Sequence, residues 1–226
     1  MNENYEEKGN AEKPSLLGMI WSPGEQLRNI RQSPKVWLPL IVVTVLSLIG
    51  GWLMILGPGF EEQFATGDLQ GENVDGLILF TKIITIVSVG VGPVLSILVG
   101  SFILWLINKA TSSEATFKQF FSMNTYIGFI GAIGAVLNGL IIAIVGGTVD
   151  KLYTSLGSLV SGEGFLGGFL NGIEIFGIWT IILTALGLRI TAQWPKALVW
   201  TIAIILFLFT IGGAVITGVT NNMSGI

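Results

Sequence analysis

The sequence predicts an all-α, polytopic membrane protein with five transmembrane helices, short cytoplasmic surface helices and an N-in, C-out topology. Of its 226 residues, 51% are hydrophobic and only 11% are charged, whereas an average soluble domain has about 25% charged residues. The mean hydropathy is +0.77. A spanning helix needs roughly 20 mostly apolar residues, and five stretches of the sequence meet this requirement. We therefore expect membrane lipid as a partner, and we do not expect nucleic acid.

The composition excludes several kinds of active site. The chain has no cysteine and no histidine, so thiol nucleophiles, histidine bases and zinc sites with nitrogen or sulfur ligands cannot form within it. No aspartate pair lies within a predicted span, and no lysine lies at depth to activate a serine. We expect a protein that is not an enzyme, without catalytic, cofactor-binding or metal-binding residues.

The first 35 residues are predicted to lie outside the bilayer, with 1–14 as a disordered cytoplasmic tail and 15–35 as an amphipathic surface segment. Ser22 and Glu25 form an S-x-x-E capping box around a proline, which predicts a helix start. Pro34 predicts that this helix ends and the next one begins. An ordinary solvated helix is the alternative. The side chains expected to meet lipid headgroups or a partner are Leu27, Arg28, Ile30, Arg31 and Lys35.

The transmembrane domain is predicted over 36–219 and is followed by an extracytoplasmic tail at 220–226. Pro93 in the second span predicts a kink, because proline breaks a backbone hydrogen bond. Glu174 and Arg189 lie near the two ends of the fourth span, where a charged group can reach the headgroups. The five predicted spans are about 36–56, 83–107, 126–145, 173–190 and 197–219.

The distribution of lysine and arginine predicts the orientation, because cytoplasmic loops carry an excess of these residues. With the N-terminus inside, nine of the 11 cations lie in cytoplasmic segments, and Lys82 and Lys151 lie outside. The nine come from three separate segments. A single misplaced span would therefore not produce this bias.

Two segments between the spans carry local signals. Thr111 and Glu114 form a second capping box, which predicts a cytoplasmic surface helix over 111–121. The second outside loop, 146–172, mixes glycine with leucine and phenylalanine, and an interfacial helix, a shallow re-entrant segment and a floppy loop all stay open for it. The predicted partner or lipid surface is completed by Phe117, Lys118 and Phe120.

Small residues recur at four-residue spacing in the second and third spans, where they let helix backbones approach closely in lipid. Packing within the bundle is the predicted role, and an interface with another protein is the alternative. The residues are Gly92, Ser96, Gly100, Gly128, Gly131, Ala132, Ala135 and Gly139. Thr85, Ser88, Ser96 and Asn138 could line a polar path, which keeps a small permease or channel subunit as an alternative function.

Three stretches resemble the bacterial branch of the Yip-domain family. They are a Ser-Pro-Gly-Glu helix start, Ser-Pro-Lys-Val-Trp-Leu-Pro-Leu before the first span, and Phe-Lys-Gln-Phe-Phe-Ser before the third. The stretch 13–25 is similar to a Bacillus-type member. The resemblance covers about 16–219 and is carried by loose motifs, so it supplies no site residue.

This resemblance implies a five-span protein of the bacterial plasma membrane. It also implies a non-enzymatic accessory protein that binds or helps assemble an ABC-type exporter and its membrane-fusion-like subunit, in resistance to a secreted toxic peptide. The oligomeric state stays open.

Overall fold

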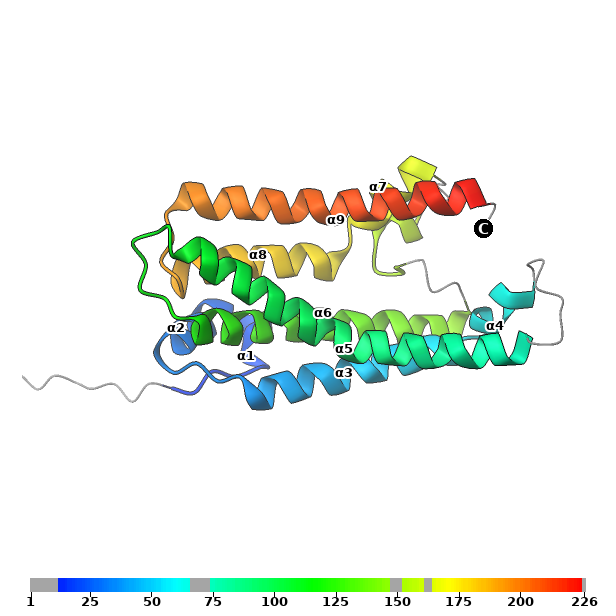
Figure 1. Ribbon diagram of the computed structural model, residues 1–226, viewed down its shortest axis with the longest axis horizontal. Helices are drawn as coiled ribbons and strands as arrows, with labels where there is room; N and C mark the ends of the chain where they lie inside the picture. The colour runs from blue at the N-terminus through cyan, green and yellow to red at the C-terminus, as the bar shows by residue number, and fades with distance from the viewer. Residues whose placement is uncertain (1–11, 66–73, 147–151, 161–163, 225–226) are drawn as a thin grey trace, which may run out of the picture.

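The computed structural model describes residues 12–65, 74–146, 152–160 and 164–224. Within these ranges the long helices run in alternating directions along one axis (Figure 1). The elements in chain order are α1 Gly18–Trp21, α2 Pro23–Gln32, α3 Trp37–Leu56, α4 Pro58–Ala65, α5 Val74–Asn108, α6 Phe117–Val145, the 3-10 helix η1 Leu156–Ser158, α7 Gly164–Gly172, α8 Ile175–Ile190 and α9 Lys196–Ser224.

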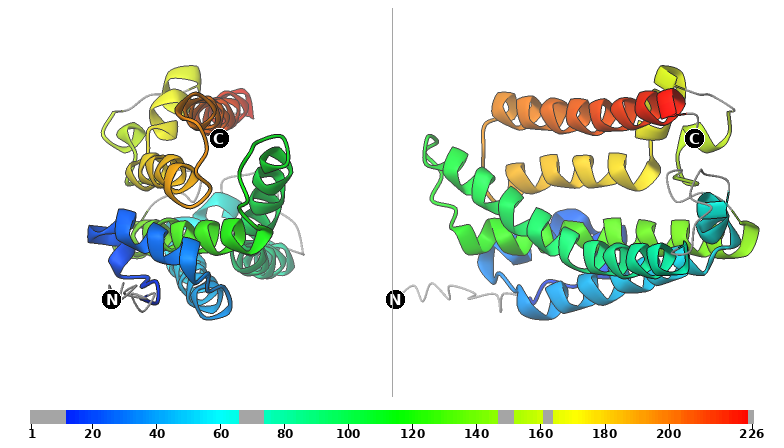
Figure 2. Two further views of the ribbon diagram at one scale, coloured as in Figure 1. Left: turned by 90° about the vertical axis from the view of Figure 1, so that its left-hand side faces the viewer. Right: turned by 45° about the vertical axis from the view of Figure 1, so that its right-hand side comes forward.

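The helices form two groups. In the first, α3, α5 and α6 pack on one another, and each is long and apolar enough to cross a membrane. In the second, α9 packs on α7 and α8, and α9 is the fourth helix of spanning length and composition in the described residues. Helix α8 joins the groups because it contacts both α6 and α9 (Figure 2).

Helix α5 is longer than its predicted span, since it begins at Val74 rather than near residue 83. It contains Pro93, and its ribbon bends about halfway along (Figures 1 and 2). Proline removes one backbone donor and crowds the preceding turn, which accounts for a bend in an otherwise continuous helix.

The predicted fourth span is a shorter helix than a typical crossing. Helix α8 has 16 residues, or about 24 Å at 1.5 Å per residue, against a hydrocarbon thickness of about 30 Å. It lies beside only part of α9 (Figure 1). The described chain therefore contains four candidate spans and this shorter apolar helix.

Glu174, which was expected to reach the headgroups, is buried within the protein, with only 8% of its surface exposed. Its carboxylate accepts hydrogen bonds from the Thr154 hydroxyl (2.5 Å), Phe176 N (3.1 Å) and Gly177 N (2.5 Å). The Asn138 amide of α6 donates in turn to the Thr154 hydroxyl (2.7 Å). Because these bonds offset the cost of burying a carboxylate, Glu174 caps α8 inside the protein.

The described part of 146–172 holds η1 and α7, and α7 packs along α9. A Cβ on Gly168 would lie 2.6 Å from Val215 Cα, and one on Gly172 would lie 3.1 Å from Ile211 Cα. These glycines repeat every four residues and let the two backbones touch. The floppy-loop alternative is thus wrong for 164–172, although residues 147–151 and 161–163 lie outside the described ranges.

Helix α6 begins at Phe117 and is capped by Thr116. Gln119 N donates to the Thr116 hydroxyl (3.4 Å), and Thr116 N donates to Gln119 Oε1 (2.7 Å), which completes a capping box. The predicted box at Thr111 is therefore wrong. The separate surface helix expected over 111–121 is a turn followed by the start of α6.

The predicted capping box at Ser22 is also not formed. The Ser22 hydroxyl donates to Gly18 O (3.3 Å) instead of capping α2. Gln26 takes over the anchoring of this start, since its Oε1 accepts from Ser15 N (2.7 Å). A Cβ on Gly18 would lie 2.6 Å from Gln26 Cδ, so a side chain at residue 18 would displace the Gln26 side chain.

The two tails differ in part from the prediction. Residues 1–11 lie outside the described ranges, but Pro14 is buried, and its carbonyl accepts a hydrogen bond from the Tyr126 hydroxyl (2.9 Å). At the other end, α9 continues as a helix to Ser224. The ordered protein therefore extends further than 15–219 at both ends.

The closest helix contact in the first group joins α3 to α6. A Cβ on Gly50 would lie 2.8 Å from Ala135 C, and one on Gly139 would lie 3.0 Å from Leu53 Cβ. Neither backbone has room for a side chain, which is the arrangement expected where small residues replace the hydrophobic driving force.

The remaining small residues from the sequence analysis divide into two sets, those packed within the bundle and those with little or nothing around them. Gly128 packs on Ile97, and Ala132 is 4% exposed. A Cβ on Gly92 or Gly131 would meet no atom within 4 Å, one on Gly100 would make only an ordinary contact, and Ser96 is exposed.

Substitution of Gly50 by leucine should destabilise the protein by about 1–3 kcal/mol, because α3 and α6 must separate to admit the side chain. Gly131→Leu is the matched control, since it adds the same side chain to α6 where nothing lies nearby. Thermal unfolding of the detergent-purified proteins measures the difference. Equal melting temperatures for the two variants would contradict the close contact.

Candidate functional site

One end of the long axis carries most of the described cations. Helix α2, the α5–α6 connection and the α8–α9 turn meet there, and the C-terminus of α9 lies at the opposite end with α4 (Figure 1). At that opposite end, Lys82 pairs with Glu61 (2.5 Å). We name the first end the cationic end; its lysines and arginines are Arg28, Arg31, Lys35, Lys109, Lys118, Arg189 and Lys196.

Helix α2 is docked into the bundle by its apolar side. Leu27 and Ile30 are fully buried in a core that also contains Phe120 of α6. The Thr191 hydroxyl at the end of α8 donates to Leu27 O (3.1 Å). These three apolar side chains were expected on an outward surface, but burying them against α6 and α8 is more favourable than exposing them. The correction is that they hold α2 in place.

The outward part of the predicted surface consists of charged side chains. Arg28, Arg31, Lys35 and Lys118 are exposed. Phe117 is half-buried, and its ring contacts Trp105 at 6.1 Å and Phe121 at 5.7 Å between centroids. The described surface is therefore cationic with an aromatic margin.

A buried asparagine fixes the α5–α6 connection. Asn108, the last residue of α5, is 5% exposed. Its Nδ2 donates to Ser113 O (3.2 Å) and Ala115 O (3.0 Å), and its Oδ1 accepts from Trp194 Nε1 (2.7 Å). One side chain thus holds the connection in shape and ties it to the α8–α9 turn.

The α8–α9 turn is fixed from its own side as well. Trp194 is fully buried, with its ring 5.9 Å from that of Phe120. The Ser113 hydroxyl donates to Ala192 O (2.5 Å), and Arg189 donates to Trp194 O. Gln193 adopts a φ of 57°, which is uncommon for a residue with a side chain. The hydrogen bonds to Ala192 O and Trp194 O, on either side of Gln193, hold this conformation.

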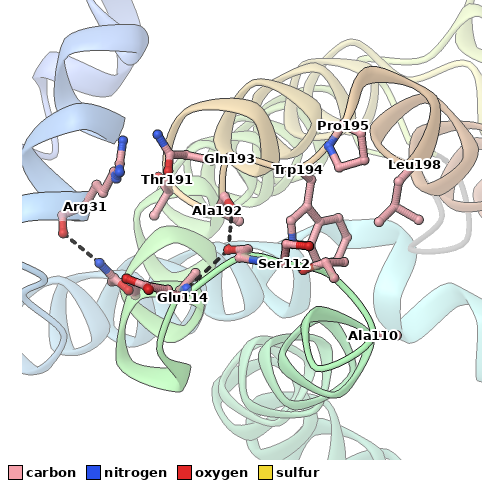
Figure 3. Close-up of a pocket in the computed structure, with 14 residues that line it drawn as sticks. Arg31, Ala110, Ser112, Glu114, Thr191, Ala192, Gln193, Trp194, Pro195 and Leu198 are labelled. Carbon is pink, nitrogen blue, oxygen red and sulfur yellow. Dashed lines mark hydrogen bonds between the residues drawn. The ribbon is translucent and has the colours of Figure 1, made fainter.

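A cleft opens between these elements (Figure 3). Its volume is 840 Å³. Gln119 Nε2 donates to Arg31 O (2.7 Å), which joins the end of α2 to the wall of the cleft. The lining residues are Arg31, Ala110, Thr111, Ser112, Ser113, Glu114, Ala115, Gln119, Thr191, Ala192, Gln193, Trp194, Pro195 and Leu198.

The sequence analysis did not identify Asn108 or Trp194 as site residues. A signal existed, because an asparagine ending a long apolar run and a tryptophan before Pro195 are both unusual at a polar connection. Nothing in the sequence indicated that the two side chains meet. Among the described residues, no group of three His, Cys, Asp or Glu side chains could hold a metal ion.

Replacing Asn108 by alanine should loosen both connections. The change leaves the Ser113 and Ala115 carbonyls and the Trp194 indole without their partner, at a cost of about 1–3 kcal/mol. Hydrogen exchange should accelerate in peptides covering 109–116 and 191–195. Ser112→Ala, an exposed change in the same connection, is the control. If exchange stays as slow in Asn108→Ala as in this control, Asn108 does not hold the two connections together.

Comparison with known proteins agrees with this architecture. The Yip1 domain model matches residues 17–218. The chain is 32% identical over 219 residues to "Membrane protein YknW" of Bacillus subtilis (strain 168), covering 95% of this chain and 94% of that protein. The resemblance of 13–25 to a Bacillus-type member is thereby confirmed. No solved structure matches. With a family model spanning nearly all of its helices, the chain belongs to the Yip1-domain family of membrane proteins.

Proposed function

We propose that this chain is a non-enzymatic accessory protein of the bacterial plasma membrane, which binds or helps assemble a membrane partner through its cationic end. The observation that carries the proposal is the set of exposed cations on a rigidly held backbone at one end of the bundle. By likeness to its family, the partner is an ABC-type exporter or its membrane-fusion-like subunit, and the process is resistance to a toxic peptide.

The surface that recognises the partner consists of Arg28, Arg31, Lys35 and Lys118 with the margin at Phe117. Exposed charges at the edge of an interface speed the association with an acidic patch on a partner and set the orientation of the two proteins. They contribute less to the affinity itself. Anionic lipid headgroups attract the same side chains at about 1 kcal/mol each. Both contacts keep the cationic end at the membrane surface.

The proposed topology is N-in and C-out with five crossings. Helix α8 brings the chain back to the cationic end before α9 leaves it again (Figure 1), which supports α8 as the short fourth crossing. In this arrangement, 15–35 lies on the cytoplasmic surface and 36–219 forms the transmembrane domain. The positive-inside rule then places the cationic end in the cytoplasm.

The permease alternative is less well supported. Ser88 and Ser96 are exposed on α5 rather than turned into the bundle. The Asn138 amide is bonded to Gly134 O (3.0 Å) and to Thr154 (2.7 Å). These polar groups therefore do not line a shared path through the described helices. Flux through proteoliposomes of the purified protein would reverse this preference.

Single cysteines test the topology, since the chain has none of its own. Cysteines at the exposed positions Gly76 and Met223 should react with an impermeant maleimide in intact cells, and one at Ser112 should react only after permeabilisation. Met223 separates five crossings from four, because a chain crossed only by α3, α5, α6 and α9 would return its end to the cytoplasm. Protection of Met223→Cys in intact cells would refute the five-span proposal.

Reversing two surface charges tests the partner-binding role. Arg28→Glu with Lys118→Glu should lower recovery of the exporter partner about tenfold in pull-downs from native membranes, because like charges then meet across the rim. Arg31 is kept because it lines the cleft. Lys13→Glu with Lys196→Glu changes the net charge equally, at exposed positions outside this surface. Equal recovery with both double variants would refute the role of the surface.

A further inference from the structure

The cleft at the cationic end presents one positive and one negative side chain. Arg31 and Glu114 are the two charged groups among its lining residues, and both are exposed. Within the described residues, the salt bridge present joins Lys82 to Glu61, so Arg31 and Glu114 are paired neither with each other nor with another charge. Both charges are available to a ligand that carries one of each sign.

The backbone that bears these groups is fixed before any ligand arrives. Arg31 O is bonded to Gln119, and the carbonyls on either side of Glu114, at Ser113 and Ala115, are both held by Asn108. In Figure 3, Arg31 and Glu114 come from different sides of the cleft. A preorganised site of this kind binds with less loss of conformational entropy than a mobile loop would.

Aromatic residues place the cleft at the level of the lipid headgroups. Trp21, Trp37 and Trp200 are 70%, 77% and 67% exposed at the cationic end. Trp105 lies one turn below the α5–α6 connection, with Lys109 Nζ 4.2 Å from its ring. Tryptophan is enriched at the boundary between headgroups and hydrocarbon. The cleft just beyond this belt therefore faces the headgroup layer.

The wall of the cleft continues into apolar surface. Leu198 lines the cleft on the first turn of α9, and Ile205 and Phe209, which follow on the same face of this helix, are 45% and 79% exposed. A ligand whose head is polar and whose tails are apolar can satisfy both regions at once.

We propose that the cleft binds the zwitterionic headgroup of phosphatidylethanolamine. The Arg31 guanidinium and the Gln193 amide donate to the phosphate, and the Glu114 carboxylate accepts from the primary ammonium. Charge-assisted hydrogen bonds on both ends of the headgroup provide the specificity. The apolar face of α9 carries the acyl chains. The site shares Arg31 with the partner-recognition surface but differs from it in Glu114, which takes no part in that surface.

The chemistry distinguishes this lipid from other common ones. Phosphatidylglycerol offers the phosphate but no cation for Glu114. Phosphatidylcholine has a quaternary ammonium, which carries charge but cannot donate a hydrogen bond. Only a primary ammonium meets the carboxylate with both charge and donors.

Native mass spectrometry of the full-length protein tests the proposal with an equimolar mixture of the three lipids bearing identical acyl chains. The wild-type protein should retain phosphatidylethanolamine about fivefold over each of the others. Glu114→Gln should lower the retention of phosphatidylethanolamine to that of phosphatidylcholine, and Arg31→Gln should lower the retention of all three lipids. Glu25→Gln and Lys13→Gln are matched controls, exposed and outside both the cleft and the cationic surface, and should behave as wild type.

Three results would overturn the proposal. The first is wild-type retention without preference, and the second is a preference that is unchanged in Glu114→Gln. The third is competition by glycerophosphoethanolamine, which has no acyl chains, at the same concentration as the lipid, since this would assign the cleft to a soluble ester. The Glu114→Gln and Arg31→Gln variants should both melt at the wild-type temperature in lipid-free detergent, because the altered side chains are exposed. Partner recovery by Arg28→Glu with Lys118→Glu is measured separately, so the two proposals can fail independently.

Discussion

The hydrogen bond from the Trp194 indole to Asn108 is the contact on which the cationic end depends. It joins the end of α5 to the turn between α8 and α9, two points 86 residues apart in the chain. Asn108 accepts this bond with its Oδ1, and its Nδ2 donates to the two carbonyls that shape the connection into α6. In an environment of low dielectric, losing one partner leaves several buried groups unsatisfied. This bond therefore ties the two helix groups together at the cationic end, in addition to the packing of α8 on α6.

The N-terminal segment also helps to hold the two helix groups together. Leu27 and Ile30 fill the space between α6 and α8, and the carbonyls of Leu27 and Lys35 accept hydrogen bonds from Thr191 and Ser122. Lys35 O and the Ser122 hydroxyl are 2.6 Å apart. A segment expected to lie flat on lipid is thus a structural part of the bundle. Its charged residues face outward because its apolar ones are used inside.

Helices and their apolar character could be predicted from the sequence, because hydropathy and length depend on local composition alone. The positions of α3 and the second half of α5 follow directly from it. What could not be predicted were contacts that join distant residues. Gly50 against Ala135, and Gly168 against Val215, are visible only when two helices are brought together.

The candidate site, like the fold, could be predicted from the sequence only in part. The exposed cations of α2 could be recognised from their spacing, whereas Leu27, Ile30 and Phe120 have the same amphipathic pattern whether they meet lipid or another helix. Periodicity gives the apolar face but not its partner. The cleft itself depends on Asn108 reaching Trp194, which no local pattern encodes.

Glu174 shows how irregular backbone is stabilised in the interior of the protein, away from the cationic end. The chain is not helical between α7 and α8, and non-helical backbone inside a membrane requires partners within the protein. Thr154 O accepts from Ile175 N (3.3 Å), and Ile173 O accepts from Leu156 N (3.0 Å). Among the described buried side chains, every nitrogen and oxygen has a hydrogen-bond partner. Because this network replaces the bonds of an unbroken helix, α8 can start well inside the bundle and still reach the cationic end, where the cleft and the exposed cations lie.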